Sequence, residues 1–186
     1  MAAIREAAAA AITGHAIFTA VGIGNAVVAG PPDAANHSDD LICLQPRCLA
    51  AAQVAAGLYS GGGLEGDICT EDVTFTDPAA CCSGRAEVVE AFRALRWTRP
   101  EHITTPRASQ ADGALHVHLH QRYFSSPWWR GLEVKSTLVL KHAPDGQICE
   151  LEERWNDAPL LRWRPFYWAR RVNGRLSSLL TPLLLR

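Results

Sequence analysis

The sequence lacks the short motifs that identify the common hydrolases, metalloproteases and nucleotide-binding enzymes. It contains no GxSxG, HExxH or GxxxxGK[ST] pattern. The GxG pair formed by Gly22 and Gly24 neither follows a predicted strand nor opens a predicted helix, so it is not a dinucleotide-binding fingerprint. These absences remove support from all three enzyme classes.

Acidic side chains are absent after Asp157. Residues 1–157 hold all 19 acidic residues and 12 of the 18 basic ones, a net charge of −7, whereas residues 158–186 hold six Arg. An acidic body does not suit the phosphate backbone, so we expect no nucleic-acid partner. The chain has 186 residues, of which 48% are apolar and 20% charged, and this predicts one globular domain with extensions.

The cysteines lack the paired spacing of a disulfide framework or a zinc site. Six are present, but no CxxC pair occurs, and Cys81 and Cys82 are adjacent. A domain of this size buries enough surface to fold without covalent links. We interpret the six as free, mostly buried thiols, which favours a reducing compartment, and we expect no structural metal and no cofactor.

Three histidines, His116, His118 and His120, alternate along one predicted strand and therefore share a face. Such a face could bind a metal, but no Cys or carboxylate lies near the three in sequence. With Thr137 and Val139, they form a face that is less charged than a solvated strand usually is. We favour a sheet surface that contacts a second copy, and thus a homodimer.

The two ends differ from the middle of the chain. Residues 7–32 are rich in Ala and Gly and carry no charge, which fits an intracellular helix or leader, an organellar leader, or a signal peptide or anchor. Residues 1–40 are predicted to be this leader and a linker, residues 41–160 the folded domain, and residues 161–186 an Arg-rich amphipathic tail. We favour an intracellular protein, in the cytoplasm or an organelle.

The tail mixes Leu, Trp, Phe and Tyr with Arg at close spacing, which excludes a membrane-spanning helix. We expect it to pack its apolar stripe on its own acidic domain, with its guanidinium groups paired to acids. The alternatives are peripheral contact with a membrane surface and contact with a protein partner.

The middle of the chain has clear periodicity. Apolar residues at helical spacing predict helices, and alternating residues predict strands. The expected helices cover 47–60, 64–69 and 85–97, and the expected strands cover 72–76, 114–124, 132–142 and 147–155. An Asp145-Gly146 turn joins the last two strands, so the three long strands are expected to form an antiparallel meander.

Period-two alternation assigns an inward face to each long strand. These faces consist of Leu115, Val117, Leu119, Gln121 and Tyr123; Leu132, Val134, Ser136, Leu138 and Leu140; and Cys149, Leu151, Glu153 and Trp155. They contain no Lys or Arg, and Asp77 continues the apolar face of Val73 and Phe75. Burial disfavours a charged carboxylate, so Asp77 and Glu153 are the candidate proton carriers.

The order of these elements resembles that of the SnoaL-like domains of the nuclear transport factor 2-like superfamily. The residues that carry the resemblance are Tyr59, DVTFTDP at 72–78, Ser83-Gly84-Arg85 leading into EVVEAFRAL, and ICELEERWND followed by Pro159-Leu160. It covers roughly residues 44–160. It implies an α+β fold, a cystatin-like roll in which a strongly bent antiparallel sheet wraps around helices as a cone with a pocket at its wide end.

Such domains include ketosteroid isomerases, polyketide cyclases, dehydratases and members without chemistry, so the fold does not choose the function. Members that resemble the isomerases use a pocket carboxylate as proton shuttle, but no residue pattern here matches their catalytic motifs residue by residue, and the catalytic candidates that this chain offers are Asp77 and Glu153. The expected ligand-lining residues are Tyr59, Gln121, Tyr123 and Trp155. Leu151 stands where related last strands often carry a His, so an acid–base pair that includes this His is not expected.

Each candidate also has a purely structural reading. Asp77 could cap the backbone of the Asp-Pro turn, Glu153 could form a salt bridge at the rim, and Trp155 could belong to the core. We therefore predict a pocket for a small apolar or lipid-like molecule. The alternatives are a cofactor-free isomerase, cyclase or dehydratase that uses carboxylate proton transfer, and a non-catalytic dimeric module at a membrane surface.

Overall fold

The computed structural model describes residues 46–59, 68–95, 100–123, 132–158, 160 and 164–184. The described helices are α2 (Pro46–Gly57), α3 (Arg85–Ala94) and α4 (Arg164–Leu184). The described strands are β1 (Cys69–Thr76), β2 (Cys81–Ser83), β3 (Glu101–His102), β4 (Arg107–Ala111), β5 (Ala114–Tyr123), β6 (Leu132–His142) and β7 (Ile148–Trp155).

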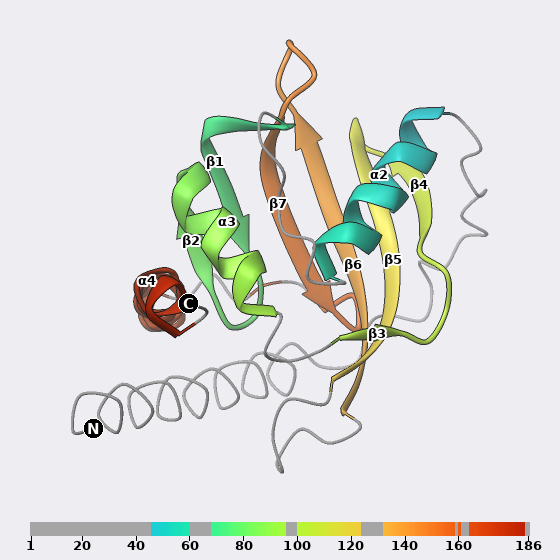
Figure 1. The fold of residues 1–186 in the computed structure, drawn as a ribbon. Coiled ribbons are helices and arrows are strands. Elements are labelled where there is room, and N and C mark those ends of the chain that lie inside the picture. The colour runs from blue at the N-terminus through green and yellow to red at the C-terminus, as the bar shows by residue number, and fades with distance from the viewer. Residues whose placement is uncertain are drawn as a thin grey trace.

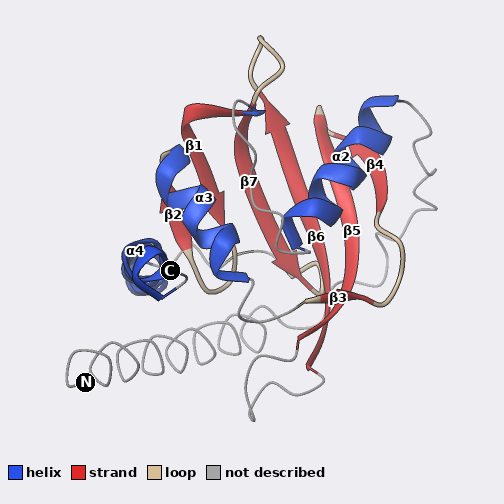
Figure 2. Cartoon of the chain, viewed as in Figure 1, coloured by secondary structure: helices blue, strands red, loops and turns tan. Residues whose placement is uncertain are grey.

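The described strands form one sheet in the order β2-β1-β7-β6-β5-β3, and β4 also pairs with β5. Strands β1 and β7 run parallel, while the other described pairs are antiparallel. Helices α2 and α3 lie over the same face of this curved sheet, and α4 lies beside its β2 edge (Figures 1 and 2). The predicted α+β class with a bent, mostly antiparallel sheet is confirmed.

The predicted meander is confirmed as β5, β6 and β7, and the helices predicted over 47–60 and 85–97 are confirmed as α2 and α3. The short strands β2, β3 and β4 were not predicted, because segments of two to five residues show too little alternation to be recognised. The leader over 1–40 and most of the helix predicted over 64–69 lie outside the described residues.

The inward faces are confirmed along most of each strand. Val117, Leu138, Leu140 and Leu151 are fully buried, and such burial contributes about 1.5–3 kcal/mol for each large aliphatic side chain. Cys149 is an exception, because a register shift between Lys141 and His142 places a bulge at this point of the β6–β7 ladder. Ile148 takes the buried position instead, and Cys149 is only half-buried.

The aromatic part of the core joins α2, α3 and β1. The ring of Phe92 lies 4.8 Å from that of Phe75 and 5.8 Å from that of Tyr59, the latter edge to face. Tyr59 follows α2 in a wider π turn, and its side chain is almost completely buried. These contacts fix the direction in which the phenol of Tyr59 points.

The interpretation of the cysteines is wrong in part. Cys69, Cys81, Cys82 and Cys149 are free thiols, and burial raises the pKa of Cys82, which disfavours its thiolate form. Cys48, however, is disulfide-bonded, with a partner outside the described residues. Sequence spacing did not indicate this bond, because the six cysteines show neither a CxxC pair nor the repeated spacing of a disulfide framework.

The tail forms α4 and packs against α3 and β2, which confirms that it docks on its own domain. Arg171 donates two hydrogen bonds to the Glu87 carboxylate, at 2.6 and 3.0 Å. Gly174 lies against the backbone of Cys81 so closely that a side chain there would overlap the Cys81 carbonyl. None of the described helices combines the length and the apolar composition needed to span a membrane.

Candidate functional site

Parallel pairing of β1 with β7 brings the two candidate carboxylates together. Thr76 pairs with Glu152, so the next residue of each strand, Asp77 and Glu153, follows on the inward side. Both are buried, with 6% and 3% of the side chain exposed. Two acids that lie 76 positions apart in the sequence thus share one buried environment.

Glu153 accepts a hydrogen bond from the segment that follows α2. The Tyr59 hydroxyl donates a 2.6 Å hydrogen bond to Glu153 Oε2. Burial raises the pKa of Glu153, while the Tyr59 donor and the nearby Ser136 and Trp155 side chains act to lower it. Its position in the middle of the sheet and its burial contradict the reading of a salt-bridged rim residue.

Asp77 does cap the turn that follows β1. Its Oδ1 accepts a 2.7 Å hydrogen bond from the Ala79 NH and a second one from the Ala80 NH. Even so, burial and the negative charge of Glu153 raise the pKa of Asp77 to about 7, against the lowering effect of these NH groups and of Arg170. The capping role and the raised pKa therefore occur in the same side chain.

The second pair of predicted lining residues lies on β5. The Tyr123 hydroxyl donates a 2.9 Å hydrogen bond to Gln121 Oε1, and both side chains are buried. Burial, together with the charges of Glu153 and Asp77, raises the pKa of Tyr123 well above its usual value, and burial with Glu153 does the same for Tyr59. Both phenols remain neutral hydrogen-bond donors at any physiological pH.

Several buried polar atoms of this cluster have no hydrogen-bond partner among the described residues. They are Glu153 Oε1, Gln121 Nε2, Ser136 Oγ and Trp155 Nε1. Ser136 and Trp155 approach Glu153 closely enough to lower its pKa without completing a hydrogen bond. Buried polar groups are almost always hydrogen-bonded, so this group of atoms has an unused capacity to bind a polar atom.

The structure thus places all six predicted site residues close together, in one largely buried cluster on the inner side of the sheet. Sequence reasoning missed Arg170, which reaches Asp77 from α4 and is only 4% exposed. The sequence predicts no Lys or Arg on the inward faces of the three long strands, and Arg170 comes from the tail and not from these strands. The one available signal was the closely spaced Arg residues of a segment whose packing the sequence does not specify.

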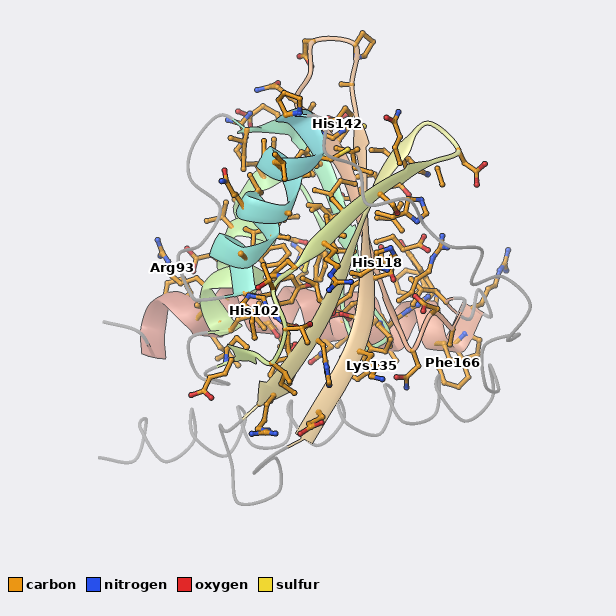
Figure 3. All side chains as sticks on the ribbon, turned by 90° about the vertical axis from the view of Figure 1, so that its right-hand side faces the viewer. Arg93, His102, His118, Lys135, His142 and Phe166 are labelled. Carbon is orange, nitrogen blue, oxygen red and sulfur yellow. The ribbon has the colours of Figure 1, made fainter. Side chains whose placement is uncertain are left out.

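The outer face of the sheet holds a different set of contacts. Ser109 Oγ lies 3.3 Å from His118 Nε2, His118 Nδ1 lies 3.1 Å from Thr137 Oγ1, and Thr137 donates a 2.5 Å hydrogen bond to Asp157. His120 lies 3.5 Å from the Glu133 carboxylate. His118 and Lys135, which lie on the neighbouring strands β5 and β6, are labelled in Figure 3. In the described part of the chain, no three His, Cys, Asp or Glu side chains converge as metal ligands would.

The inner cluster can hold one proton between two carboxylates. A carboxyl group with a pKa near 7 is a proton donor at neutral pH, while its neighbour can accept a proton. The titration belongs to the pair because each charge affects the other. Two neutral phenols and an amide complete a set of groups that can hold a polar atom and move a proton.

No family model matches the sequence, and no curated protein matches it either. Solved structures with a similar course of the chain include a SnoaL-like family member from Agrobacterium tumefaciens, with a TM-score of 0.43 and 16% identity over 59% of this chain and 97% of that one. A nuclear transport factor 2-like protein from Anabaena variabilis has a TM-score of 0.47 and 14% identity over 62% and 93%. A steroid delta-isomerase from Pseudomonas aeruginosa has a TM-score of 0.46 and 17% identity over 78% and 98%.

All three TM-scores lie below 0.5 and all three identities below 20%, so these matches carry no argument about the reaction or ligand of this chain. The chemistry has to come from its own residues.

Proposed function

We propose that the cluster around Glu153 binds a small, largely apolar molecule through one polar group. The observation that carries this proposal is the set of unpartnered buried atoms, namely Glu153 Oε1, Gln121 Nε2, Ser136 Oγ and Trp155 Nε1. Each such atom costs about 1–3 kcal/mol when it is left unsatisfied. A bound carbonyl oxygen could accept from Gln121 Nε2, Ser136 Oγ or Trp155 Nε1, and a bound hydroxyl group could also donate to Glu153 Oε1, so that part of this cost would be recovered.

The surroundings of these atoms favour an apolar ligand body. In the sheet, Glu153 pairs with Leu138, which pairs with Val117, and both aliphatic side chains are fully buried. Phe92 covers Tyr59 from α3. A charged or strongly hydrated ligand would lose its solvation here without enough partners, whereas an apolar ligand with one carbonyl would not.

A second function, proton transfer, is favoured by the raised pKa of Asp77. In this mechanism, the Glu153 carboxylate removes a proton from a carbon next to the carbonyl group of the ligand. The electron pair moves onto the carbonyl oxygen, which the protonated Asp77 stabilises as a donor. Return of the proton to another carbon completes an isomerisation, and no cofactor takes part in these steps.

Binding is tested with a series of apolar cyclic ketones and phenols against the full chain, by calorimetry and by the shift in melting temperature. We expect at least one series member to bind with a stoichiometry of one. Glu153→Gln should weaken binding or change its dependence on pH. Glu133→Gln makes the same substitution on the outer face and should have no effect. Absence of saturable binding across the series would overturn the proposed site.

Proton transfer has a separate measurement. Cyclic ketones incubated with the chain in D2O should exchange their α-protons faster than in buffer, as followed by NMR. Glu153→Gln should reduce this exchange by a factor of about 100 or more, the usual contribution of a positioned base. If ketones bind but exchange stays at the buffer rate, the site is a binding site without this chemistry.

A further inference from the structure

Helix α4 buries its polar side. Its least exposed residues include Arg170, Asn173 and Thr181, which are 4%, 5% and 3% exposed, and the buried Gly174. Asn173 Nδ2 donates a 3.1 Å hydrogen bond to the Ala79 carbonyl. Polar contacts and one close backbone approach thus fix the helix on β2 and α3.

The opposite side of α4 is apolar and faces solvent. Trp168, Val172, Leu176 and Leu179 are 62%, 55%, 43% and 62% exposed, and we call these four residues the apolar stripe. Successive members lie four, four and three residues apart, so they form one line along the helix. Tyr167, which is 43% exposed, lies beside the first of them.

This orientation contradicts our expectation that the tail would pack its apolar stripe on the domain. An amphipathic helix of a globular protein normally turns its apolar side toward the core. Here, the buried side is occupied by the contacts that hold the helix, and the apolar side is left outward. A contiguous exposed apolar line of this kind marks a surface that meets a partner or a membrane.

The charges on the exposed side are all positive. Arg164 and Arg175 are exposed and precede Trp168 and Leu179 by one helical turn, so they lie on the same side as the apolar stripe. Two other guanidinium groups of the helix are used inside the molecule, since Arg171 binds Glu87 and Arg170 lies near Asp77. The helix contains no acidic residue to repel an anionic surface.

We propose that α4 docks this chain in the plane of an anionic lipid surface. The apolar stripe enters the boundary between headgroups and acyl chains, and Arg164 and Arg175 bind the lipid phosphates. Trp168 and Tyr167 have the amphipathic rings that are enriched at this depth of a bilayer. Helix α4 lies beside the β2 edge, outside the layers formed by the sheet with α2 and α3 (Figure 1).

Lipid fits this side of α4 better than a protein partner does. The exposed side presents apolar groups beside two cations, and α4 contains no acidic side chain. A bilayer surface supplies anionic headgroups directly next to an apolar phase, which matches Arg beside Trp and Leu. The inference is independent of the chemistry at Glu153 and would stand if the binding site there failed.

The test uses the full chain with vesicles of phosphatidylcholine alone or with 30% phosphatidylserine, separated by flotation. We expect saturable binding to the anionic vesicles, and binding about 20-fold weaker to the neutral ones, because each basic side chain near an anionic surface contributes about 1 kcal/mol. Raising the salt to 0.5 M should weaken binding to the anionic vesicles severalfold.

Two variants separate the apolar and charged contributions. The triple variant Trp168→Ser, Val172→Ser and Leu179→Ser should lower vesicle affinity about 100-fold, because three large side chains no longer enter the lipid. Arg164→Gln with Arg175→Gln should remove the preference for anionic over neutral vesicles. The matched controls are Leu49→Ser, which changes a 49% exposed residue of α2, and Lys135→Gln on the exposed part of β6, and neither should alter binding.

Circular dichroism and denaturation midpoints establish that each variant is folded. The proposal is overturned if the folded full chain does not bind anionic vesicles, or if the folded triple variant binds them as tightly as the wild type. It is also overturned if vesicles are not bound and the triple variant converts a dimer to a monomer in sedimentation, since the apolar stripe would then be an interface between copies.

Discussion

The two faces of the sheet differ in how exposed their polar side chains are and in whether these side chains have hydrogen-bond partners. On the outer face, charged groups lie at the surface and have partners, as in Arg122 with Glu133 and Lys141 with Glu150. On the inner face, Glu153 and Gln121 are buried, and each retains a polar atom without a partner among the described residues. Both faces come from the same strands and differ by one residue of alternation.

This difference separates structural from functional polar groups. The outer pairs are screened by water and contribute little to stability, yet they complete their own hydrogen bonding. The inner cluster has a cost in stability that its own contacts do not offset, since burial raises the pKa of both carboxyl groups. Groups that are retained at such a cost are candidates for a binding or catalytic role.

The largest expected effect is a loss of stability with rising pH. Because the pKa of Asp77 is raised in the folded state, its contribution is fully present below about pH 4 and is lost as pH rises through about 7. The full loss is on the order of 4 kcal/mol, with about 2 kcal/mol of it between pH 5.5 and 8. Urea unfolding across this range measures it, and Asp77→Asn should flatten the dependence.

The outer face supplies the control for this pH effect. Arg122 lowers the pKa of Glu133, so the stabilising effect of that acid is lost only as pH falls through its lowered pKa. Glu133→Gln should therefore leave the slope between pH 5.5 and 8 intact. An equal flattening in both variants would mean that the slope does not come from the inner pair.

A smaller loss of stability is expected from a substitution at the contact between α4 and β2. Gly174→Ala adds a Cβ that overlaps the Cys81 backbone, so α4 must shift, at a cost of about 2–3 kcal/mol. The control is Gly57→Ala in α2, where no atom lies within 4 Å of the added Cβ and a gain of up to about 1 kcal/mol is expected. Chemical denaturation of both variants decides whether α4 is part of the folded unit.

Removal of a single inner hydrogen bond should have a smaller effect still. Tyr59→Phe leaves Glu153 Oε2 without its donor and should cost about 1–2 kcal/mol. Because the Tyr59 donor acts to lower the pKa of Glu153, its loss should raise that pKa further, and the cost should be smaller at acidic than at alkaline pH. Tyr167→Phe removes an exposed hydroxyl of α4 and should leave the midpoint unchanged. A cost that does not fall with decreasing pH would contradict a hydrogen bond from Tyr59 to the charged form of Glu153.

The outer ion pairs should give the smallest effect. Glu133→Gln removes the partner of Arg122 at the surface, and the denaturation midpoint should not move at physiological salt. A clear destabilisation would show that the outer face is covered in solution, as a dimer through this face would require. Sedimentation of the wild type and of this variant would then show whether a second copy of the chain covers this face.

Much of the site could be predicted from alternation alone. The inward positions of Gln121, Tyr123 and Glu153 follow from the period of two, because a side chain on a strand can only point to one face or the other. The end of β1 just before Asp77 could also be predicted, since Pro78 stops the strand. The bulge at Cys149 could not be predicted, because it depends on how β7 pairs with β6.

The sequence by itself determined the elements and their faces, because helical and strand periods are local properties of neighbouring residues. Only the tertiary structure decided that β1 lies parallel to β7, which places Asp77 beside Glu153. It also decided that α4 turns Arg170 inward and its apolar stripe outward. Such contacts join residues far apart in the chain, and their choice depends on how all the buried surfaces fit together, which no local pattern records.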